Sequence, residues 1–225
     1  MITLATIDGR YSMAQSMSAD MPIVFVVDDD PSVRESLELS IENSGWRPET
    51  FTSAREFLAH PRASVPSCLV LDVALPDLTG LQLQKRVAAT RPDMPIIFIT
   101  ACADVATSVE AMKAGAFEFL TKPVREEALL AAISQALDRS RRTLEHEARL
   151  AALRRRYASL TTREREVMEL VVTGLLNKQV AGELGISEIT VKAHRGQVMR
   201  KMKADSLPAL VTMAARLDLE PAAMC

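Results

Sequence analysis

The sequence predicts a two-domain protein, an α/β domain with a doubly wound five-stranded parallel sheet followed by a smaller all-helical domain. Three observations lead to this prediction. The length of 225 residues suits two ordinary domains rather than one or three. The first part alternates short β-branched runs with segments of helical periodicity, which is typical of a parallel sheet covered by helices. Beyond about residue 160, only helical segments separated by short turns follow.

The first predicted strand, at residues 23–27, has the sequence IVFVV, which is apolar throughout, as expected for a strand covered on both faces. Asp29 or Asp30 can cap the helix that follows, Pro31 suits its first turn, and Gly45 ends it. The same alternation then repeats. We expect further strands at residues 47–51, 68–71, 96–100 and 117–120, and helices at residues 53–58, 81–89, 106–114 and 126–137.

Two segments flank this domain. Residues 1–20 show no apolar periodicity and no signal-peptide pattern, so we expect a disordered N-terminal tail before a domain at residues 21–138. Residues 139–157 contain no glycine or proline and are rich in arginine, glutamate, leucine and alanine. Their heptad pattern is patchy, which predicts a helical linker that a dimer partner can help to stabilise rather than a regular coiled coil.

The last domain, residues 158–225, is predicted to contain four short helices. Thr161 and Glu164 form a capping box for the first, which ends at Gly174. The others are expected at residues 178–184, 188–202 and 207–216. A tight turn with Gly185 joins the second helix to the third, and the third carries lysine and arginine on its outer face. This arrangement is typical of a helix-turn-helix.

The composition of the sequence favours some classes of protein and excludes others. Residues 1–137 carry 11 Lys and Arg against 18 Asp and Glu, whereas the last 88 residues have a net charge of +5. An acidic N-terminal part and a basic C-terminal part suggest a regulatory or metal-binding domain joined to a domain that binds a polyanion. The three cysteines have no paired spacing, which argues against a disulfide framework or a zinc site and favours a cytoplasmic setting. No apolar run approaches the ~20 residues of a membrane helix, so no membrane is expected among the partners.

Three carboxylates are predicted to meet at one edge of the sheet. Asp28 and Asp29 follow the first strand, and Asp72 follows the third. These strands are neighbours if the strand order is 2-1-3-4-5, so their carboxyl ends lie side by side. Clustered carboxylates repel unless a hard cation joins them, and Mg²⁺ or another divalent cation prefers such oxygen ligands. Solvated helix-capping aspartates are the alternative for any one of them alone.

Two other groups are placed at the same edge. Thr100 ends the fourth strand, and Lys122 follows the fifth, directly before Pro123. A hydroxyl and an ammonium group are suited to contact a phosphoryl group. Cys102 lies in a loop close to this edge, where a redox role and a plain thiol are the two alternatives.

The segments VVDDDPSVR, LVLDVALPDLTG, FITA and FEFLTKP resemble the receiver domain of two-component response regulators, which has a flavodoxin-like fold. The segments LTTRERE, GLLNKQVAGELGIS and TVKAHRGQVMRKM resemble the LuxR-type helix-turn-helix of the FixJ/NarL transcription factors. The resemblance covers about residues 22–216 and is strongest to FixJ-like regulators.

The resemblance implies that Asp72 is the phosphoacceptor and that Asp29, Asp72 and the backbone carbonyl of Ala74 bind Mg²⁺ directly. It implies that Asp28 belongs to the same Mg²⁺ site but acts mainly through water. Lys122 and Thr100 would then contact the phosphoryl group, and Phe119 would be the aromatic switch residue that turns inward as Thr100 moves. In the second domain, the resemblance directs Lys192, Ala193 and Gly196 to base edges. It places four other residues near phosphates, namely Thr190, Arg195, Arg200 and Lys201.

The implied function is that of a response regulator. Phosphorylation of Asp72 by a sensor histidine kinase drives a switch and homodimerisation, which control promoter DNA binding and transcription, with activation and an RNA polymerase contact expected. The protein would accept one phosphoryl group and slowly lose it, without being a turnover enzyme. One alternative is a pseudo-receiver transcription factor controlled by a ligand or partner. Another is a hydrolase that uses the acidic cluster, which would leave the helix-turn-helix unexplained. The absence of a GxxxxGK[ST] sequence excludes an ATPase output of the P-loop type.

Overall fold

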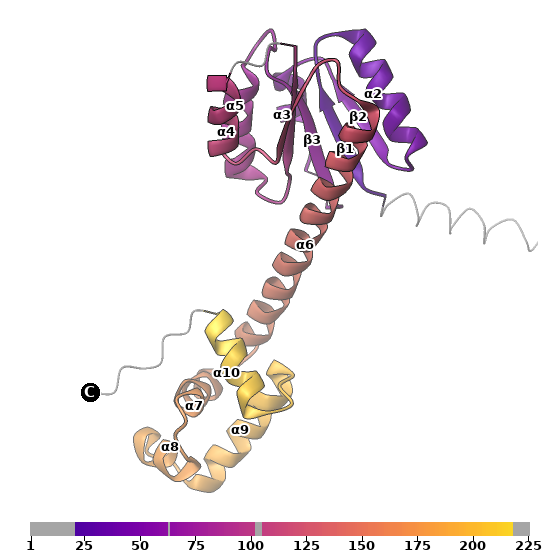
Figure 1. The fold of residues 1–225 in the computed structure, drawn as a ribbon. Helices are drawn as coiled ribbons and strands as arrows, with labels where there is room; N and C mark the ends of the chain where they lie inside the picture. The colour runs from indigo at the N-terminus through magenta and orange to yellow at the C-terminus, as the bar shows by residue number, and fades with distance from the viewer. Residues whose placement is uncertain (1–20, 63, 102–104, 218–225) are drawn as a thin grey trace, which may run out of the picture. The chain divides into compact units, whose positions relative to one another are not determined.

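The computed structural model describes residues 21–62, 64–101 and 105–217 (Figure 1). The predicted disordered tail at residues 1–20 and the thiol of Cys102 lie outside these described residues. The chain divides into two compact units, Met1–Leu144 and Glu145–Cys225. Among the described residues, no helix is both long and apolar enough to cross a membrane.

The first unit is built on a parallel sheet of five strands in the order β2-β1-β3-β4-β5, which confirms the predicted fold class. The strands are β1 (Ile23–Val27), β2 (Arg47–Phe51), β3 (Ser67–Asp72), β4 (Ile96–Thr100) and β5 (Glu118–Thr121). The strand order reverses between β1 and β3, because the chain goes from β1 outward to β2 and then returns to β3 on the other side. Ligand sites of such sheets lie at the carboxyl ends of the strands beside this switch point.

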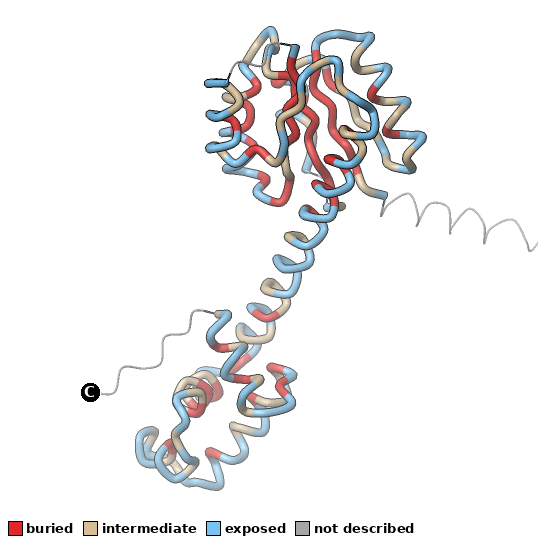
Figure 2. The backbone as a smooth tube through the Cα atoms, viewed as in Figure 1, coloured by how far each residue is buried: buried red, intermediate tan, exposed pale blue. Residues whose placement is uncertain are grey.

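In the described part of the chain, five helices cover the two faces of the sheet: α2 (Pro31–Asn43), α3 (Ala54–Ala59), α4 (Gly80–Thr90), α5 (Val105–Lys113) and α6 (Glu126–Ala158). Helices α3, α4 and α5 pack on the face that presents Phe25 and Leu69. Helices α2 and α6 pack on the opposite face, which presents Val24 and Val70. The central strands are therefore buried on both sides, as Figure 2 shows, which explains their unbroken apolar sequences.

The second unit contains the rest of α6 and four short helices: α7 (Thr162–Val172), α8 (Asn177–Leu184), α9 (Glu188–Met202) and α10 (Leu207–Arg216). Their apolar faces share one core, in which Val167, Val180 and Val191 are fully buried. The turn from α8 to α9 passes through Gly185 at φ +64°, a left-handed conformation that suits glycine.

Several predicted elements, such as those at residues 96–100 and 188–202, have the observed bounds, and most other ends differ by one or two residues. The exception is α6, in which the helix predicted at residues 126–137 continues without a break to Ala158. Helix α3 begins at Ala54 because the Ser53 side chain accepts a hydrogen bond from the backbone N–H of Glu56 and so acts as the cap. Strand β5 covers Glu118–Thr121 rather than residues 117–120. Caps and ladder contacts decide these ends, whereas the apolar pattern identifies only the middle of each element.

Candidate functional site

The carboxylates of Asp28, Asp29 and Asp72 come together at the carboxyl ends of β1 and β3. One oxygen from each lies within 4.8 Å of the others. Asp28 is fully buried and Asp72 is 7% exposed, while Asp29 is exposed to solvent. The two strands are neighbours in the sheet, so the backbone itself brings these side chains together. Three carboxylate oxygens, one of them open to water, form a donor set that fits a hard divalent cation which retains water ligands.

Backbone groups orient the two buried carboxylates. One oxygen of Asp28, Oδ1, accepts a hydrogen bond of 3.0 Å from the N–H of Asp30. The Oδ1 of Asp72 accepts one of 3.1 Å from the N–H of Ala74, which holds the Ala74 backbone beside the cluster. The carbonyl oxygen of Asp28 accepts a further bond of 2.7 Å from Arg34 of α2. Each carboxylate is therefore held by one oxygen and presents the other, Oδ2, toward the site.

Lys122 occupies the centre of the site. Its Nζ donates to Oδ2 of Asp28 and to Oδ2 of Asp72, both at 2.7 Å. Burial alone would lower the pKa of Lys122, but the bonds to the two carboxylates outweigh it, and the pKa is raised above its ordinary value. The ammonium group is thus charged at neutral pH and compensates the two buried carboxylates. A cis peptide bond joins Lys122 to Pro123, and the N–H of Lys122 donates to the carbonyl of Thr100 at 2.8 Å.

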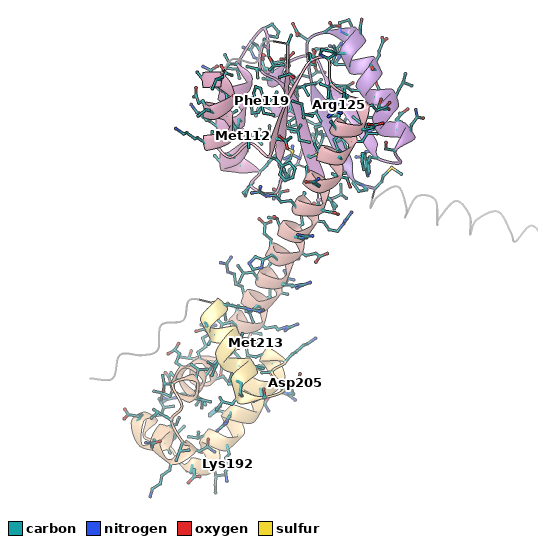
Figure 3. All side chains as sticks on the ribbon, viewed as in Figure 1. Met112, Phe119, Arg125, Lys192, Asp205 and Met213 are labelled. Atoms are coloured by element: carbon teal, nitrogen blue, oxygen red, sulfur yellow. The ribbon has the colours of Figure 1, made fainter. Side chains whose placement is uncertain are left out.

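Thr100 and Phe119 lie on the two strands next to the cluster. Thr100 ends β4 and is 2% exposed. Phe119, which Figure 3 labels, lies on β5. It is opposite Phe98 of β4, and the centres of the two rings are 6.0 Å apart. The Phe119 side chain is half-buried against the core that α3, α4 and α5 cover. Thr100 and Phe119 therefore link the carboxyl-end edge of the sheet to its apolar interior, while their role as a switch stays a prediction.

The loop between β3 and α4 is held by two residues to which sequence reasoning gave little or no role. The N–H of Gly80 donates to the carbonyl of Val73 at 2.9 Å, and a Cβ at position 80 would lie 2.5 Å from the carbonyl oxygen of Asp72. Only glycine allows α4 to begin this close to the end of β3. The carboxylate of Asp77 accepts bonds from the N–H groups of Ala54 and Arg55 at the start of α3.

The ionisation of Asp77 follows from these bonds. Desolvation works to raise the pKa of Asp77, but the N–H donors of Arg55 and Ala54, together with those of Asp77 itself and Leu78, lower it below the ordinary value. Gly80 belongs to a quoted receiver-like segment, so its place in the turn could be found from the sequence. Asp77 belongs to the same segment, but its capping role could not be found there, because the helix that it caps begins more than twenty residues away.

The second predicted site lies on α9. The N-terminus of α9 is capped by Ser187, whose Oγ accepts from the N–H of Thr190 at 3.1 Å. Of the seven residues predicted to contact DNA, five are exposed, namely Thr190, Lys192, Ala193, Gly196 and Arg200. Lys192, Ala193 and Gly196 are spaced so that they share one face of the helix, whereas Val191 and Val198 are buried against the core.

The predicted phosphate contacts already have partners within the protein. The hydroxyl of Thr190 lies 2.8 Å from that of Ser187, and Arg195 donates to Asn177 of α8 at 2.9 Å. Arg200 bonds Gln197, one turn back along α9. A DNA phosphate would therefore compete with, or add to, these contacts, and the predicted roles of these side chains stay predictions.

Lys201 is part of a partly buried ion pair. Its Nζ donates to Glu164 of α7 at 2.6 Å, and the Glu164 side chain is only 7% exposed. Burial works to raise the pKa of Glu164, but Lys201 and the N–H of Thr161 lower it below its ordinary value. Lys201 thus joins α9 to α7, a structural role that the sequence analysis did not identify. Its predicted contact with a DNA phosphate stays a prediction.

Comparison with known proteins assigns both units to families. Residues 24–134 match the response regulator receiver domain, and residues 158–214 match the bacterial regulatory proteins of the luxR family. The chain is 46% identical to nodulation protein W of Bradyrhizobium diazoefficiens over 94% of this chain and 93% of the relative. It is 42% identical to the response regulator protein TmoT of Ectopseudomonas mendocina, over 90% and 92% of the two chains. It is 45% identical to the transcriptional regulatory protein FixJ of Azorhizobium caulinodans, over 88% and 94%.

Solved structures agree with these assignments. The response regulator StyR superposes with a TM-score of 0.80 at 46% identity, over 87% of this chain and 99% of that chain. Full-length FixJ from B. japonicum superposes with a TM-score of 0.51 at 38% identity, over 86% and 96%.

A receiver domain followed by a LuxR-type helix-turn-helix defines a class of DNA-binding transcription regulators that are controlled by phosphorylation and are generally not enzymes. The chain belongs to the two-component response regulators of this class, as do relatives named FixJ and TodT. A histidine kinase and DNA are therefore its implied partners. Receiver domains bind Mg²⁺ through acidic residues, and the cluster of Asp28, Asp29 and Asp72 could hold such an ion.

Proposed function

We propose that Asp72 is the residue that accepts the phosphoryl group from a sensor histidine kinase. Its position at the end of β3, beside Asp28 of the neighbouring strand and bonded to Lys122, carries the proposal. A carboxylate oxygen of Asp72 attacks the phosphorus of a phosphohistidine, the P–N bond breaks, and the imidazole leaves with the electron pair of that bond. The product is an acyl phosphate on Asp72, which water later hydrolyses back to the carboxylate and inorganic phosphate.

Asp28, Asp29, Asp72 and the carbonyl of Ala74 are the groups we expect to hold Mg²⁺. When bound, the cation supplies positive charge that offsets the repulsion between the carboxylates and the incoming phosphoryl oxygens. Lys122 has its ammonium group between Asp28 and Asp72, and we propose that it exchanges a carboxylate oxygen for a phosphoryl oxygen. Thr100, at the end of the next strand, is placed to donate its hydroxyl to the same group.

The switch must supply a defined free energy. Changing the ratio of inactive to active protein from 99:1 to 1:99 requires about 5.5 kcal/mol of differential stabilisation. A hydrogen bond to a charged group contributes about 1.5–3 kcal/mol. Because Lys122 already makes two such bonds in this structure, phosphorylation replaces bonds there rather than adding them. The exchange of bonds at Lys122 therefore supplies at most part of the requirement, and we propose that homodimerisation supplies the rest.

We further propose the following division of the chain. Residues 21–138 form the receiver, residues 139–157 a helical linker and residues 158–225 the DNA-binding domain. Phe119 turns inward when Thr100 moves, the α5–β5–α6 face becomes the dimer surface, and the dimer binds promoter DNA and contacts RNA polymerase. The chain is phosphorylated stoichiometrically and does not act as a turnover enzyme.

Labelling with a small phosphodonor tests the proposal. Wild-type protein with acetyl phosphate and Mg²⁺ should gain one phosphoryl group per chain, measured by intact-protein mass. Asp72→Asn should gain none, because the amide has nearly the same shape but is far less nucleophilic. Asp138→Asn, which changes an exposed carboxylate on α6, is the matched control and should be labelled normally. Undiminished labelling of Asp72→Asn would place the acceptor elsewhere, first at Asp28 or Asp29. Continuous release of phosphate at a high rate would indicate a hydrolase.

A further inference from the structure

The second residue of α9 is an isoleucine whose side chain is almost wholly exposed. Ile189 is 81% exposed, more than any other large apolar side chain in the described part of the chain. A single exposed apolar residue is common and needs no explanation by itself. Its place on the helix distinguishes Ile189, because α9 is the second helix of the helix-turn-helix, which enters the major groove in this type of motif.

Ile189 shares a face with the residues expected to contact base edges. Lys192, Ala193 and Gly196 follow it at three, four and seven residues, which is the spacing of neighbours along one side of an α-helix. All four are exposed, and Figure 3 labels Lys192 on α9. A Cβ added at Gly196 would meet no atom within 4 Å, so this face is open around it. Ile189 is thus the one large apolar side chain among these four positions.

The local structure holds Ile189 in place before any DNA binds. Ser187 caps the helix through the N–H of Thr190, and the hydroxyls of these two residues lie 2.8 Å apart. The backbone of position 189 lies between these two bonded residues. Isoleucine is branched at Cβ, and a helix leaves it essentially one χ1 rotamer. A contact made by Ile189 therefore costs little conformational entropy, unlike one made by a long flexible side chain.

We infer that Ile189 determines part of the DNA sequence preference by packing against the 5-methyl group of a thymine in the major groove. This methyl is the apolar group that base pairs present at their major-groove edges. Lys192 lies about 4.5 Å further along the helix axis, at about 1.5 Å per residue. Base pairs are stacked at about 3.4 Å. Because these two lengths are similar, the thymine should lie close to the base pair that Lys192 contacts. The inference rests on the proposed DNA-binding role of the α9 face.

Replacing thymine by deoxyuridine removes the methyl group alone and tests the contact directly. Full-length protein, in acetyl phosphate and Mg²⁺, would first select its preferred duplexes from a random-sequence pool. Each thymine of the selected sequence is then replaced in turn by deoxyuridine, and binding is measured by fluorescence anisotropy. For the wild-type protein, we expect one replacement to weaken binding roughly three- to tenfold.

Ile189→Ala should bind the thymine duplex as weakly as the wild-type protein binds the deoxyuridine duplex, and it should be indifferent to that replacement. Ile189→Val keeps the branch at Cβ and should be intermediate. Val211→Ala, which shortens an exposed apolar residue on α10, should keep the full methyl dependence. Thermal melting should be unchanged in Ile189→Ala because the side chain is exposed.

The outcomes separate this inference from the proposed function. A selected sequence whose binding is unaffected by every deoxyuridine replacement would overturn the inference alone. Equal methyl dependence in wild-type protein and Ile189→Ala would assign the contact to another residue, and Ala193 would be the first to examine. Failure to enrich any sequence would overturn the DNA-binding role of the α9 face, and the inference with it.

Discussion

Replacing Gly80 by alanine should strain the receiver at the residue that is proposed to accept the phosphoryl group. The new Cβ would lie 2.5 Å from the carbonyl oxygen of Asp72, and 3.0 Å from both the Cα of Val73 and a ring carbon of Phe98. Two of these three atoms belong to the backbone, so no side-chain rotation relieves the contact. The loop between β3 and α4 must shift by a few tenths of an ångström or more, and Asp72 must shift with it.

Gly80→Ala should lower the free energy of unfolding of the receiver by about 1–3 kcal/mol, which is the usual effect of adding an atom to a well-packed interior. The shift acts on the backbone of Asp72, whose carboxylate is held by the N–H of Ala74 and by Lys122. We therefore expect Gly80→Ala to slow labelling by acetyl phosphate as well as to destabilise the receiver.

Urea unfolding followed by tryptophan fluorescence isolates the receiver in the intact chain. Trp46 is the single tryptophan of the sequence and packs against the core formed by α2 and α6. The matched control is Gly182→Ala on α8, where a Cβ meets no atom within 4 Å. That variant should leave the Trp46 transition unchanged and stabilise the DNA-binding domain, seen by circular dichroism, by up to about 1 kcal/mol. An unchanged Trp46 midpoint in Gly80→Ala would show that the loop after β3 accepts a Cβ without strain.

Three further predictions concern the remaining contacts. Lys122→Ala should still be phosphorylated to some extent but should not dimerise in response, because it lacks the proposed contact between the phosphoryl group and the loop after β5. Normal phosphate-induced dimerisation in sedimentation velocity would contradict this. Leu176 is the N-cap residue of α8 and offers no side-chain acceptor, so Leu176→Ser should stabilise the DNA-binding domain by about 1 kcal/mol in urea unfolding, and a loss of stability would count against it. Glu164 has a lowered pKa, so its contribution to stability is present above its unfolded pKa of about 4.3 and is lost as the pH falls through its folded pKa. The stability of the DNA-binding domain, followed by circular dichroism, should therefore fall less steeply with decreasing pH in Glu164→Gln than in the wild-type protein. Equal acid sensitivity of the two proteins would argue against the contact between Glu164 and Lys201.

Much of the site could be predicted because parallel strands end at the same edge of a sheet. Asp28 follows β1, Asp72 ends β3 and Lys122 follows β5, and the strand order alone brings these three positions to that edge. The buried strands were equally clear, since a run such as residues 23–27 suits a strand covered on both faces. The fold class and the carboxylate cluster therefore followed from chain order and residue type.

The contacts that hold the site in place could not be predicted in this way. Asp77 caps α3 from a distant loop, and Lys201 pairs with Glu164 across two helices. Both depend on the packing of separate elements, which periodicity along one element does not contain. The family resemblance placed Lys201 among the basic residues of α9 that lie near DNA phosphates. Charge alone does not reveal that a lysine has a partner on another helix.

The most direct test of the account is whether phosphorylation at Asp72 changes DNA binding. The affinity of full-length protein for its selected duplex should be measured with and without acetyl phosphate in the presence of Mg²⁺, for wild type and for Asp72→Asn. We predict that the phosphodonor tightens binding by the wild-type protein and has no effect on Asp72→Asn. Equal affinity of the wild-type protein in both conditions, or an equal response of Asp72→Asn, would contradict control of DNA binding through this carboxylate.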